Sequence, residues 1–299
     1  MPIVRAMKAA PRLSAYAREV TLPGSGQRLF LFEAGARRAP GMLLVHGLGD
    51  EADTWRRVLP ALAERYHVVA PDLPGFGRSP LPARGRLTFR RLSAVLAELA
   101  RHTELGPVTL MGSSMGAVLS QVAALENREM VSRLILEDGG LLSNARLDGS
   151  LLLGLVPGIG ESRYRRLASN LDAAYASLRP YYADLGALPS EEREFLRQRV
   201  GERVASQTQM RAYFSLFRSF AGLLLVRGRS LSRKARALPV PTLYVWGGKD
   251  HIVPVESAQA TIKEHRGARL VVIPEAGHLP HQETPSEFLR VVSQAAQDL

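Results

Sequence analysis

The alternation of short apolar runs with helical patterns is the strongest constraint on how this chain can fold. Runs of three or four largely apolar residues occur at Met42–Val45, Val68–Ala70, Val108–Met111, Leu134–Leu136, Leu243–Trp246 and Leu270–Ile273. Segments between them repeat apolar residues every three or four positions, as Phe89, Leu92, Leu96 and Leu99 do. Strands that are apolar on both faces and separated by helices form parallel sheets covered on both sides. We therefore expect an α/β protein with a mostly parallel central sheet and helices on both faces.

Two local patterns add detail to this architecture. Glu19–Leu22 and Leu29–Glu33 flank the turn residues Pro23-Gly24-Ser25-Gly26, which predicts an antiparallel hairpin at the start of the sheet. Farther along, helical spacing predicts one continuous amphipathic helix that carries Trp55, Val58, Leu59, Leu62 and Tyr66 on one stripe.

Residues 141–236 interrupt the alternation. No strand pattern occurs there, and Leu, Ala and Arg recur with helical spacing. The segment contains 16 Lys and Arg against 8 Asp and Glu, so it carries +8 of the net charge of +11. We expect a helical cap, residues 141–236, inserted after the sixth strand of a core that comprises residues 1–140 and 237–299.

Composition narrows the possible functions. Hydrophobic residues make up 46% of the 299 residues, and the absence of cysteine excludes disulfides, thiolate metal ligands and a cysteine nucleophile. The 35 Arg and 4 Lys are not accompanied by a nucleic-acid-binding motif, so we interpret them as solvated charge and expect no nucleic-acid partner. The sequence has neither a signal-peptide pattern nor an apolar run long enough to span a bilayer, which predicts a cytoplasmic protein.

Gly112-Ser113-Ser114-Met115-Gly116 has the pattern G-x-S-x-G. It follows a predicted strand and opens a predicted helix, the context in which this pattern marks a nucleophilic serine on a tight turn. The two glycines tolerate the strained backbone that such a turn needs, and the helix N-terminus supplies partial positive charge. Ser113 is the competing serine, but only Ser114 is framed by both glycines.

Together with this motif, four further segments resemble the α/β-hydrolase family, in its esterase and lipase branch with a helical cap. His46-Gly47-Leu48-Gly49 resembles the family's oxyanion loop after the third strand, and Ala70–Ser79 resembles its next turn. Trp246-Gly247-Gly248-Lys249-Asp250 resembles the segment that delivers the acid, and Ala276-Gly277-His278 the segment that delivers the histidine. The resemblance covers the core from about residue 28 to the C-terminus.

The resemblance implies a catalytic triad in the chain order Ser114, Asp250, His278. The imidazole of His278 would take the serine proton, and Asp250 would accept the imidazole N–H and stabilise the imidazolium. His281 is the alternative base, although it lacks the preceding glycine turn. Asp138 is the alternative acid, because some relatives draw the acid from the end of the sixth strand.

The resemblance also implies an oxyanion hole formed by the backbone N–H groups of Leu48 and Met115. His46 is interpreted as a structural support of the oxyanion loop. This chemistry requires no cofactor and no metal ion, and we expect neither.

These residues predict a serine hydrolase that cleaves small-molecule carboxylic esters through an acyl-enzyme intermediate. An apolar set in the cap predicts a roof over Ser114 that favours short to medium acyl chains; its members are Leu151–Leu153, Val156, Phe214, Leu216, Phe217 and Phe220. Two alternatives stay open: a carbon–carbon bond hydrolase of aromatic degradation, which also uses serine, and a non-catalytic binding or receptor member of the fold.

Overall fold

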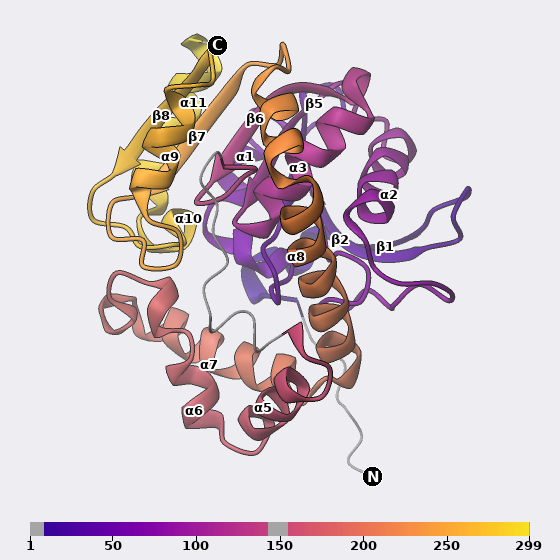
Figure 1. Cartoon of the computed structure of the whole chain (residues 1–299), viewed down its shortest axis with the longest axis vertical. Coiled ribbons are helices and arrows are strands. Elements are labelled where there is room, and N and C mark those ends of the chain that lie inside the picture. The colour runs from indigo at the N-terminus through magenta and orange to yellow at the C-terminus, as the bar shows by residue number, and fades with distance from the viewer. Residues whose placement is uncertain (1–8, 143–154, 299) are drawn as a thin grey trace.

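The central sheet has eight strands. The computed structural model describes residues 9–142 and 155–298. The strands are β1 (Ala17–Thr21), β2 (Arg28–Ala34), β3 (Gly41–Val45), β4 (His67–Pro71), β5 (Val108–Ser113), β6 (Val131–Glu137), β7 (Thr242–Gly247) and β8 (Ala268–Ile273). They lie in the order β1-β2-β4-β3-β5-β6-β7-β8 (Figure 1). β2 pairs antiparallel with β1 and β4, and all other pairs are parallel, which confirms the predicted hairpin and the mostly parallel sheet.

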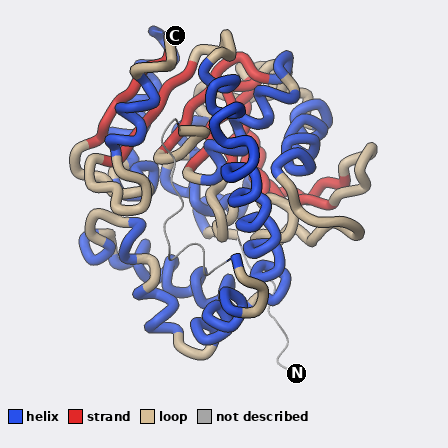
Figure 2. Tube along the Cα trace, viewed as in Figure 1, coloured by secondary structure: helices blue, strands red, loops and turns tan. Residues whose placement is uncertain are grey.

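Helices surround this sheet (Figure 2). The α-helices are α1 (Leu59–Leu62), α2 (Phe89–His102), α3 (Met115–Glu126), α5 (Ile159–Ala168), α6 (Leu171–Ala176), α7 (Ser190–Ala205), α8 (Gln207–Arg236), α9 (Val255–Ile262), α10 (Pro280–Glu283) and α11 (Pro285–Asp298). The short 3₁₀ helices are η1 (Pro11–Tyr16), η2 (Ala52–Arg57), η3 (Arg128–Met130), η4 (Arg179–Tyr181) and η5 (Leu185–Ala187).

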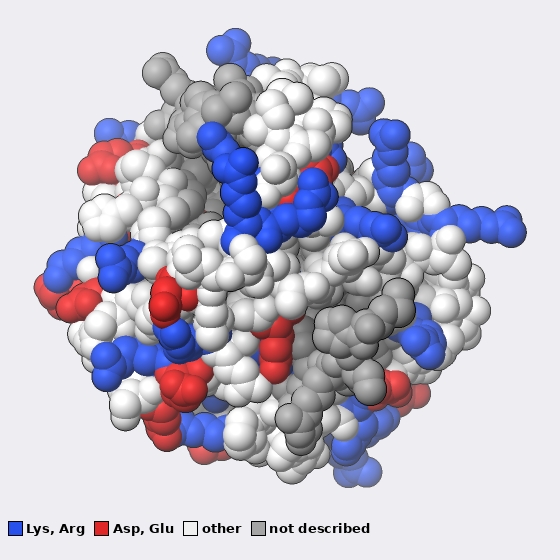
Figure 3. Space-filling model, turned by 90° about the horizontal axis from the view of Figure 1, so that it is seen from below, with Lys and Arg blue, Asp and Glu red and all other residues white. Residues whose placement is uncertain are grey.

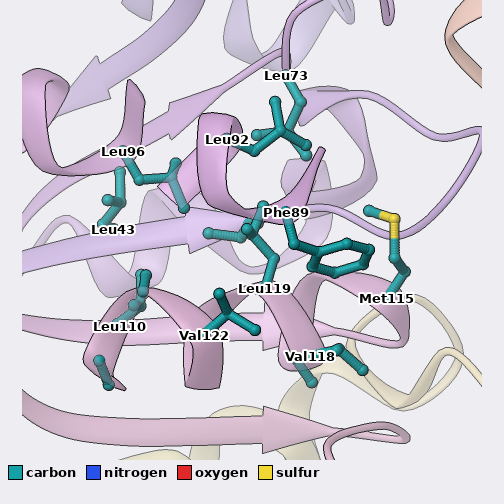
Figure 4. Close-up of a cluster of buried hydrophobic side chains, with 14 of the residues drawn as sticks. Leu43, Leu73, Phe89, Leu92, Leu96, Leu110, Met115, Val118, Leu119 and Val122 are labelled. Atoms are coloured by element: carbon teal, nitrogen blue, oxygen red, sulfur yellow. The ribbon is translucent and has the colours of Figure 1, made fainter. Parts of the chain in front are cut away.

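Each face of the sheet has its own apolar cluster, because successive side chains of a strand point to opposite faces. In β3, Leu43 and Val45 join the cluster under α2 and α3, part of which Figure 4 shows. Met42 and Leu44 join the cluster on the other face, with the side chains of η2, α1 and α11. Helices therefore cover both faces, as the sequence predicts.

The predicted continuous helix from Trp55 to Tyr66 is wrong. The segment forms two short pieces, η2 and α1, separated at Val58, where φ is −121°. Pro60 lies in the first turn of α1. Proline has no N–H with which to continue the hydrogen bonding of η2, but it is tolerated in the first turn of a new helix. The side chains of the apolar stripe are still buried. Their spacing in the sequence therefore reflects burial against the core and does not require a continuous helix.

The described residues between β6 and β7, numbers 155–236, contain helices and no strand. In Figure 1, α5, α6 and α7 lie below the sheet, whereas α8 runs from this region up along the core. α8 contacts α5 and α7 and also α2 and α3, so one helix joins the insertion to the core. Within the described residues, no helix combines the length and the apolar character needed to cross a bilayer.

The arginines of this insertion occur in two settings. Some are exposed, such as Arg163, Arg165 and Arg166 on α5, and Figure 3 shows that Lys and Arg side chains protrude over the underside of the molecule among Asp and Glu side chains. Arg199 of α7, by contrast, is only 2% exposed and contacts acidic residues of the core. The interpretation of the arginines as solvated charge thus holds for the first group and not for Arg199.

Candidate active site

Ser114 lies at the sharp turn between β5 and α3. Its backbone has φ 55° and ψ −119°, which is a strained conformation for a residue with a side chain. A Cβ atom on Gly112 would lie 2.3 Å from the carbonyl oxygen of Gly116, and a Cβ on Gly116 would lie 2.2 Å from that of Val45. The turn therefore needs both glycines of the motif, which explains why the motif marks this serine.

The structure brings Ser114, His278 and Asp250 together. The Ser114 hydroxyl lies 2.9 Å from His278 Nε2, and His278 Nδ1 lies 2.8 Å from Asp250 Oδ2. Asp250 follows β7 and His278 follows β8, so both side chains reach Ser114 from the carboxyl edge of the sheet. We call this arrangement the Ser114 chain.

Asp250 is held as a carboxylate. Its Oδ1 accepts hydrogen bonds from the backbone N–H groups of Ile252 (2.7 Å) and Val253 (3.0 Å). Burial alone would raise the pKa of Asp250, but the hydrogen bond and charge of His278 and the Val253 amide outweigh it, and the pKa lies below its ordinary value. An ionised Asp250 can therefore orient the His278 ring.

The alternative base, His281, lies in a different chain of hydrogen bonds. Its Nε2 is 2.8 Å from the Thr54 hydroxyl and its Nδ1 is 2.7 Å from Glu137 Oε1. All three residues are at most 1% exposed. We call this arrangement the Thr54 chain. The alternative nucleophile, Ser113, is likewise buried, and its hydroxyl has no hydrogen-bond partner within the described residues.

The two amides expected to form the oxyanion hole flank Ser114. Gly47 and Leu48 lie beside Ser114 in the lining of one cavity, and Met115 is the first residue of α3. In the part of the chain that the structure describes, neither the Leu48 nor the Met115 N–H has a hydrogen-bond partner. Neither donor is therefore engaged by another group among the described residues.

His46 supports the loop that carries Leu48. It is fully buried, its Nδ1 lies 2.8 Å from the Gly47 carbonyl oxygen, and its Nε2 accepts a hydrogen bond from the Leu73 amide (2.9 Å). Burial lowers the pKa of His46, which favours the neutral ring that these two contacts require. The structural role expected for His46 agrees with these contacts.

A partly buried ion-pair cluster connects this loop to the helical insertion. Arg203 of α7 makes a bidentate contact with Glu51 (2.6 and 2.7 Å) and also bonds to Asp50. Burial, reinforced by the charge of Asp50, raises the pKa of Glu51 to about 7, although Arg203 opposes the shift. Gln209 of α8 donates to the Gly49 carbonyl (2.9 Å). The insertion thus fixes the loop on which the Leu48 amide lies.

Sequence reasoning missed this cluster. The acidic residues Asp50, Glu51 and Asp53 follow the glycine-rich loop directly, and three acids beside a buried strand require basic partners. That signal was present, but it does not identify Arg199 or Arg203, which lie about 150 residues away.

A cavity of about 390 Å³ opens beside the Ser114 hydroxyl, between the core and the insertion. Its apolar lining includes Leu167, Leu178, Val200, Phe214 and Phe217, and its polar lining includes Tyr181, Tyr213 and Arg163.

The predicted apolar roof is only partly reproduced in this lining. Phe214 and Phe217 line the cavity. Leu216 belongs to the core cluster and Phe220 packs against Phe89, while Val156 is 45% exposed. Leu151–Leu153 lie outside the described residues.

This chain is similar in sequence to known hydrolases. The sequence matches the family described as alpha/beta hydrolase fold over residues 40–285. It is 27% identical to the pimeloyl-[acyl-carrier protein] methyl ester esterase of Aeromonas hydrophila over 85% of this chain and 94% of the esterase.

Two solved structures illustrate the likeness of fold. One is 2-hydroxy-6-oxo-6-phenylhexa-2,4-dienoate hydrolase from Rhodococcus, with a TM-score of 0.77 and 22% identity over 94% of this chain and 99% of the other. The second is a thermophilic esterase from Thermogutta terrifontis, with a TM-score of 0.72 and 24% identity over 94% and 98%. The sheet order, the turn at Ser114 and the family match agree, and this chain belongs to the α/β-hydrolase fold family.

Proposed function

We propose that this protein is a serine hydrolase that cleaves carboxylic esters, with Ser114 as nucleophile, His278 as base and Asp250 as the acid that orients it. The observation that carries the proposal is the continuous contact from the Ser114 hydroxyl through His278 to Asp250, at the wall of a cavity. A serine hydroxyl becomes an effective nucleophile when a neutral imidazole takes its proton during attack.

The reaction follows from these contacts. The Ser114 Oγ forms a bond to the ester carbonyl carbon while His278 Nε2 takes the hydroxyl proton. The carbonyl oxygen becomes an oxyanion, which the N–H groups of Leu48 and Met115 would stabilise. The carbon–oxygen bond to the alcohol then breaks, and the alcohol leaves with the proton from the imidazolium. A water molecule, deprotonated by His278, releases the acid and restores Ser114 in the same way.

The helical insertion bears on which ester substrates the protein would accept. We propose that residues 141–236 act as a cap over Ser114, because α5, α7 and α8 contribute most of the apolar lining of the cavity. A cavity of about 390 Å³ accommodates short to medium acyl chains. The relative that is a methyl ester esterase is consistent with an ester substrate.

Hydrolysis of nitrophenyl esters from acetate to palmitate tests this proposal. We expect kcat/KM to be highest for short to medium chains. Phe217→Ala enlarges the cavity and should move the optimum to longer chains, whereas Phe220→Ala, one turn along the same helix and outside the lining, should not. An optimum at the longest chains, with activation at an oil–water interface, would indicate a lipase.

The ester assay, run beside an assay with a carbon–carbon bond substrate, separates the alternative classes. The Rhodococcus neighbour is by name a dienoate hydrolase, and a carbon–carbon bond hydrolase would use the same three residues. Cleavage of a vinylogous diketone with negligible ester hydrolysis would favour that class, and no turnover of either substrate would favour a binding protein. The cytoplasmic location and the absence of a cofactor stay predictions.

A further inference from the structure

A second acidic residue lies directly behind the Ser114 chain. Asp138 follows β6, is fully buried and has φ 44°, so its backbone is in the left-handed region although it is not glycine. Its N–H donates to the Val245 carbonyl (3.0 Å) and its Oδ1 accepts from the Gly247 N–H (2.8 Å). The first contact fixes the backbone of Asp138 and the second fixes its side chain against β7, the strand that leads to Asp250.

The side chain of Asp138 lies close to Asp250 and His278. Oδ2 is buried and accepts no hydrogen bond within the described residues. Single ligand atoms of Asp138, Asp250 and His278 all lie within 4.8 Å of one another. A buried carboxylate oxygen without a donor is costly, and two buried carboxylates at this separation repel each other.

The hydrogen-bond donors around the two acids decide which of them is charged. Asp250 accepts from two backbone amides and from His278, all of which stabilise a carboxylate. Among the described residues, Asp138 accepts a side-chain hydrogen bond from the Gly247 amide alone. Glu137, its neighbour in sequence, adds negative charge nearby, and the Glu137 side chain is bonded to His281.

The pKa values have the directions that this arrangement requires. Burial raises the pKa of Asp138 well above its ordinary value, and the charges of Asp250 and Glu137 raise it further. The pKa of Asp250 is lowered instead, mainly because the hydrogen bond and charge of His278 outweigh the effect of burial. Of the two acids, Asp138 is therefore the one whose surroundings favour the protonated form.

We propose that Asp138 is a neutral carboxylic acid that donates a hydrogen bond from Oδ2 to the Asp250 carboxylate, and so acts as a positioning residue behind the Ser114 chain. The role in catalysis rests on the proposed function. The O–H group satisfies the otherwise unpaired oxygen and removes the repulsion. It also orients Asp250 and withdraws part of its negative charge, which limits how strongly Asp250 stabilises the His278 imidazolium.

Two substitutions test the positioning role. Asp138→Asn keeps a neutral side chain whose N–H₂ can donate to Asp250 and whose oxygen can accept from Gly247, and Asn tolerates a positive φ. It should keep most of the kcat/KM and the pH profile. Asp138→Ala removes the donor. We expect it to lower kcat/KM by about 10- to 100-fold and to move the acidic limb of the pH profile to higher pH, because the full charge of Asp250 then favours the imidazolium.

The outcomes are distinct. Loss of activity in Asp138→Asn as large as in Asp138→Ala would show that the charge of Asp138 matters, and would overturn the proposal. Wild-type kinetics in both variants would overturn it as well, since no positioning role would remain. A large loss in Asp138→Ala with rescue in Asp138→Asn supports it.

A spectroscopic measurement tests the protonation without relying on activity. In protein labelled with ¹³C at aspartate side chains only, infrared spectroscopy at neutral pH should show one protonated carboxylic acid in the wild type and none in Asp138→Asn. Labelling aspartate leaves out Glu51, which has a pKa of about 7. Absence of this band in the wild type would refute the neutral Asp138, whereas its presence in a protein that hydrolyses no ester would refute the proposed function alone.

Discussion

The Ser114 chain and the Thr54 chain have the same sequence of groups, a hydroxyl, an imidazole and a carboxylate. Their two histidines are three residues apart, at 278 and 281. The hydroxyl-to-Nε2 distances are 2.9 and 2.8 Å, and the Nδ1-to-carboxylate distances are 2.8 and 2.7 Å. Hydrogen-bond geometry therefore does not distinguish them.

The surroundings of the two hydroxyl groups distinguish the Ser114 chain from the Thr54 chain. Ser114 is half-buried, lines the cavity and precedes Met115 at the start of α3, whose N–H has no hydrogen-bond partner in the described part of the chain. Thr54 is 1% exposed, and its hydroxyl also accepts from the Gln282 amide (2.7 Å). The ring of Trp55 covers His281, with ring centres 4.4 Å apart. A substrate can reach the first hydroxyl and not the second.

This contrast indicates which features distinguish Ser114, the proposed nucleophile, from a hydroxyl group that is only hydrogen-bonded to a histidine. A strained turn presents the Ser114 hydroxyl to a cavity, and the N–H of Met115, at the start of α3, lies next to Ser114, where negative charge would develop. The Thr54 chain has neither feature. It connects η2, β6 and α10, so it fixes the segment that follows His278. We interpret the Thr54 chain as structural.

The largest expected effect distinguishes the two hydroxyl groups. Ser114→Ala should lower kcat for ester hydrolysis by about 10⁶-fold, as loss of the nucleophile does in serine proteases. Thr54→Val keeps the branched shape and removes only the hydroxyl. It should leave kcat nearly unchanged and lower the free energy of unfolding by about 1–3 kcal/mol, because His281 and Gln282 lose a buried partner.

Steady-state kinetics and urea unfolding of both variants measure this contrast, with Ser113→Ala as a control beside the proposed nucleophile. Full activity in Ser114→Ala would disprove the serine mechanism. A loss of kcat in Thr54→Val comparable to that in Ser114→Ala would mean that the two chains do not have separate roles.

A smaller effect is expected for the carboxylates. Asp250→Asn should reduce kcat by about 10⁴-fold, because the amide no longer holds the required tautomer of His278. Glu137→Gln should mainly reduce stability, by about 1–3 kcal/mol, since an amide N–H₂ would lie where Glu137 Oε2 has no partner. The comparison uses kinetics at saturating substrate and denaturation of each variant, and a larger kinetic loss in Glu137→Gln would reverse the assignment of the two acids.

The sequence predicts the Ser114 chain well because each of its members follows a strand in a local glycine pattern. Gly112 and Gly116 are required by close backbone contacts, and the same holds for Gly247 and Gly277, where a Cβ on Gly247 would lie 1.8 Å from the Gly277 carbonyl oxygen. Such steric demands leave a signal in a few adjacent residues. The catalytic roles of Ser114, His278 and Asp250 remain proposals, but the three residues could be chosen from the sequence.

The Thr54 chain and the ion pairs of Arg203 leave no such signal. Thr54 contacts a histidine 227 positions away, and Arg203 contacts a carboxylate 152 positions away. Each of these side chains is common in a loop or helix, and only the folded sheet brings the partners together. A single residue can also decide whether a helix is continuous: Pro60 lies in the segment that apolar spacing alone assigns to one helix, and the segment forms two short pieces.

The smallest expected effect concerns stability in acid. The pKa of Asp250 in the folded protein lies below its ordinary value, although burial opposes the shift, because the hydrogen bond and charge of His278 lower it. Ionised Asp250 therefore adds stability above the pKa of an unfolded aspartate, about 3.9, and this contribution is lost as the pH falls through the lower folded value. Urea unfolding between pH 7 and pH 3 should show that the stability difference between wild type and Asp250→Asn shrinks below about pH 4. Ser114→Ala keeps both His278 and Asp250, so its difference from wild type should stay constant over the same range. A difference for Asp250→Asn that also stays constant would show that the charge of Asp250 contributes nothing to folding, and that the Ser114 chain, like the Thr54 chain, is stabilised by packing and neutral hydrogen bonds.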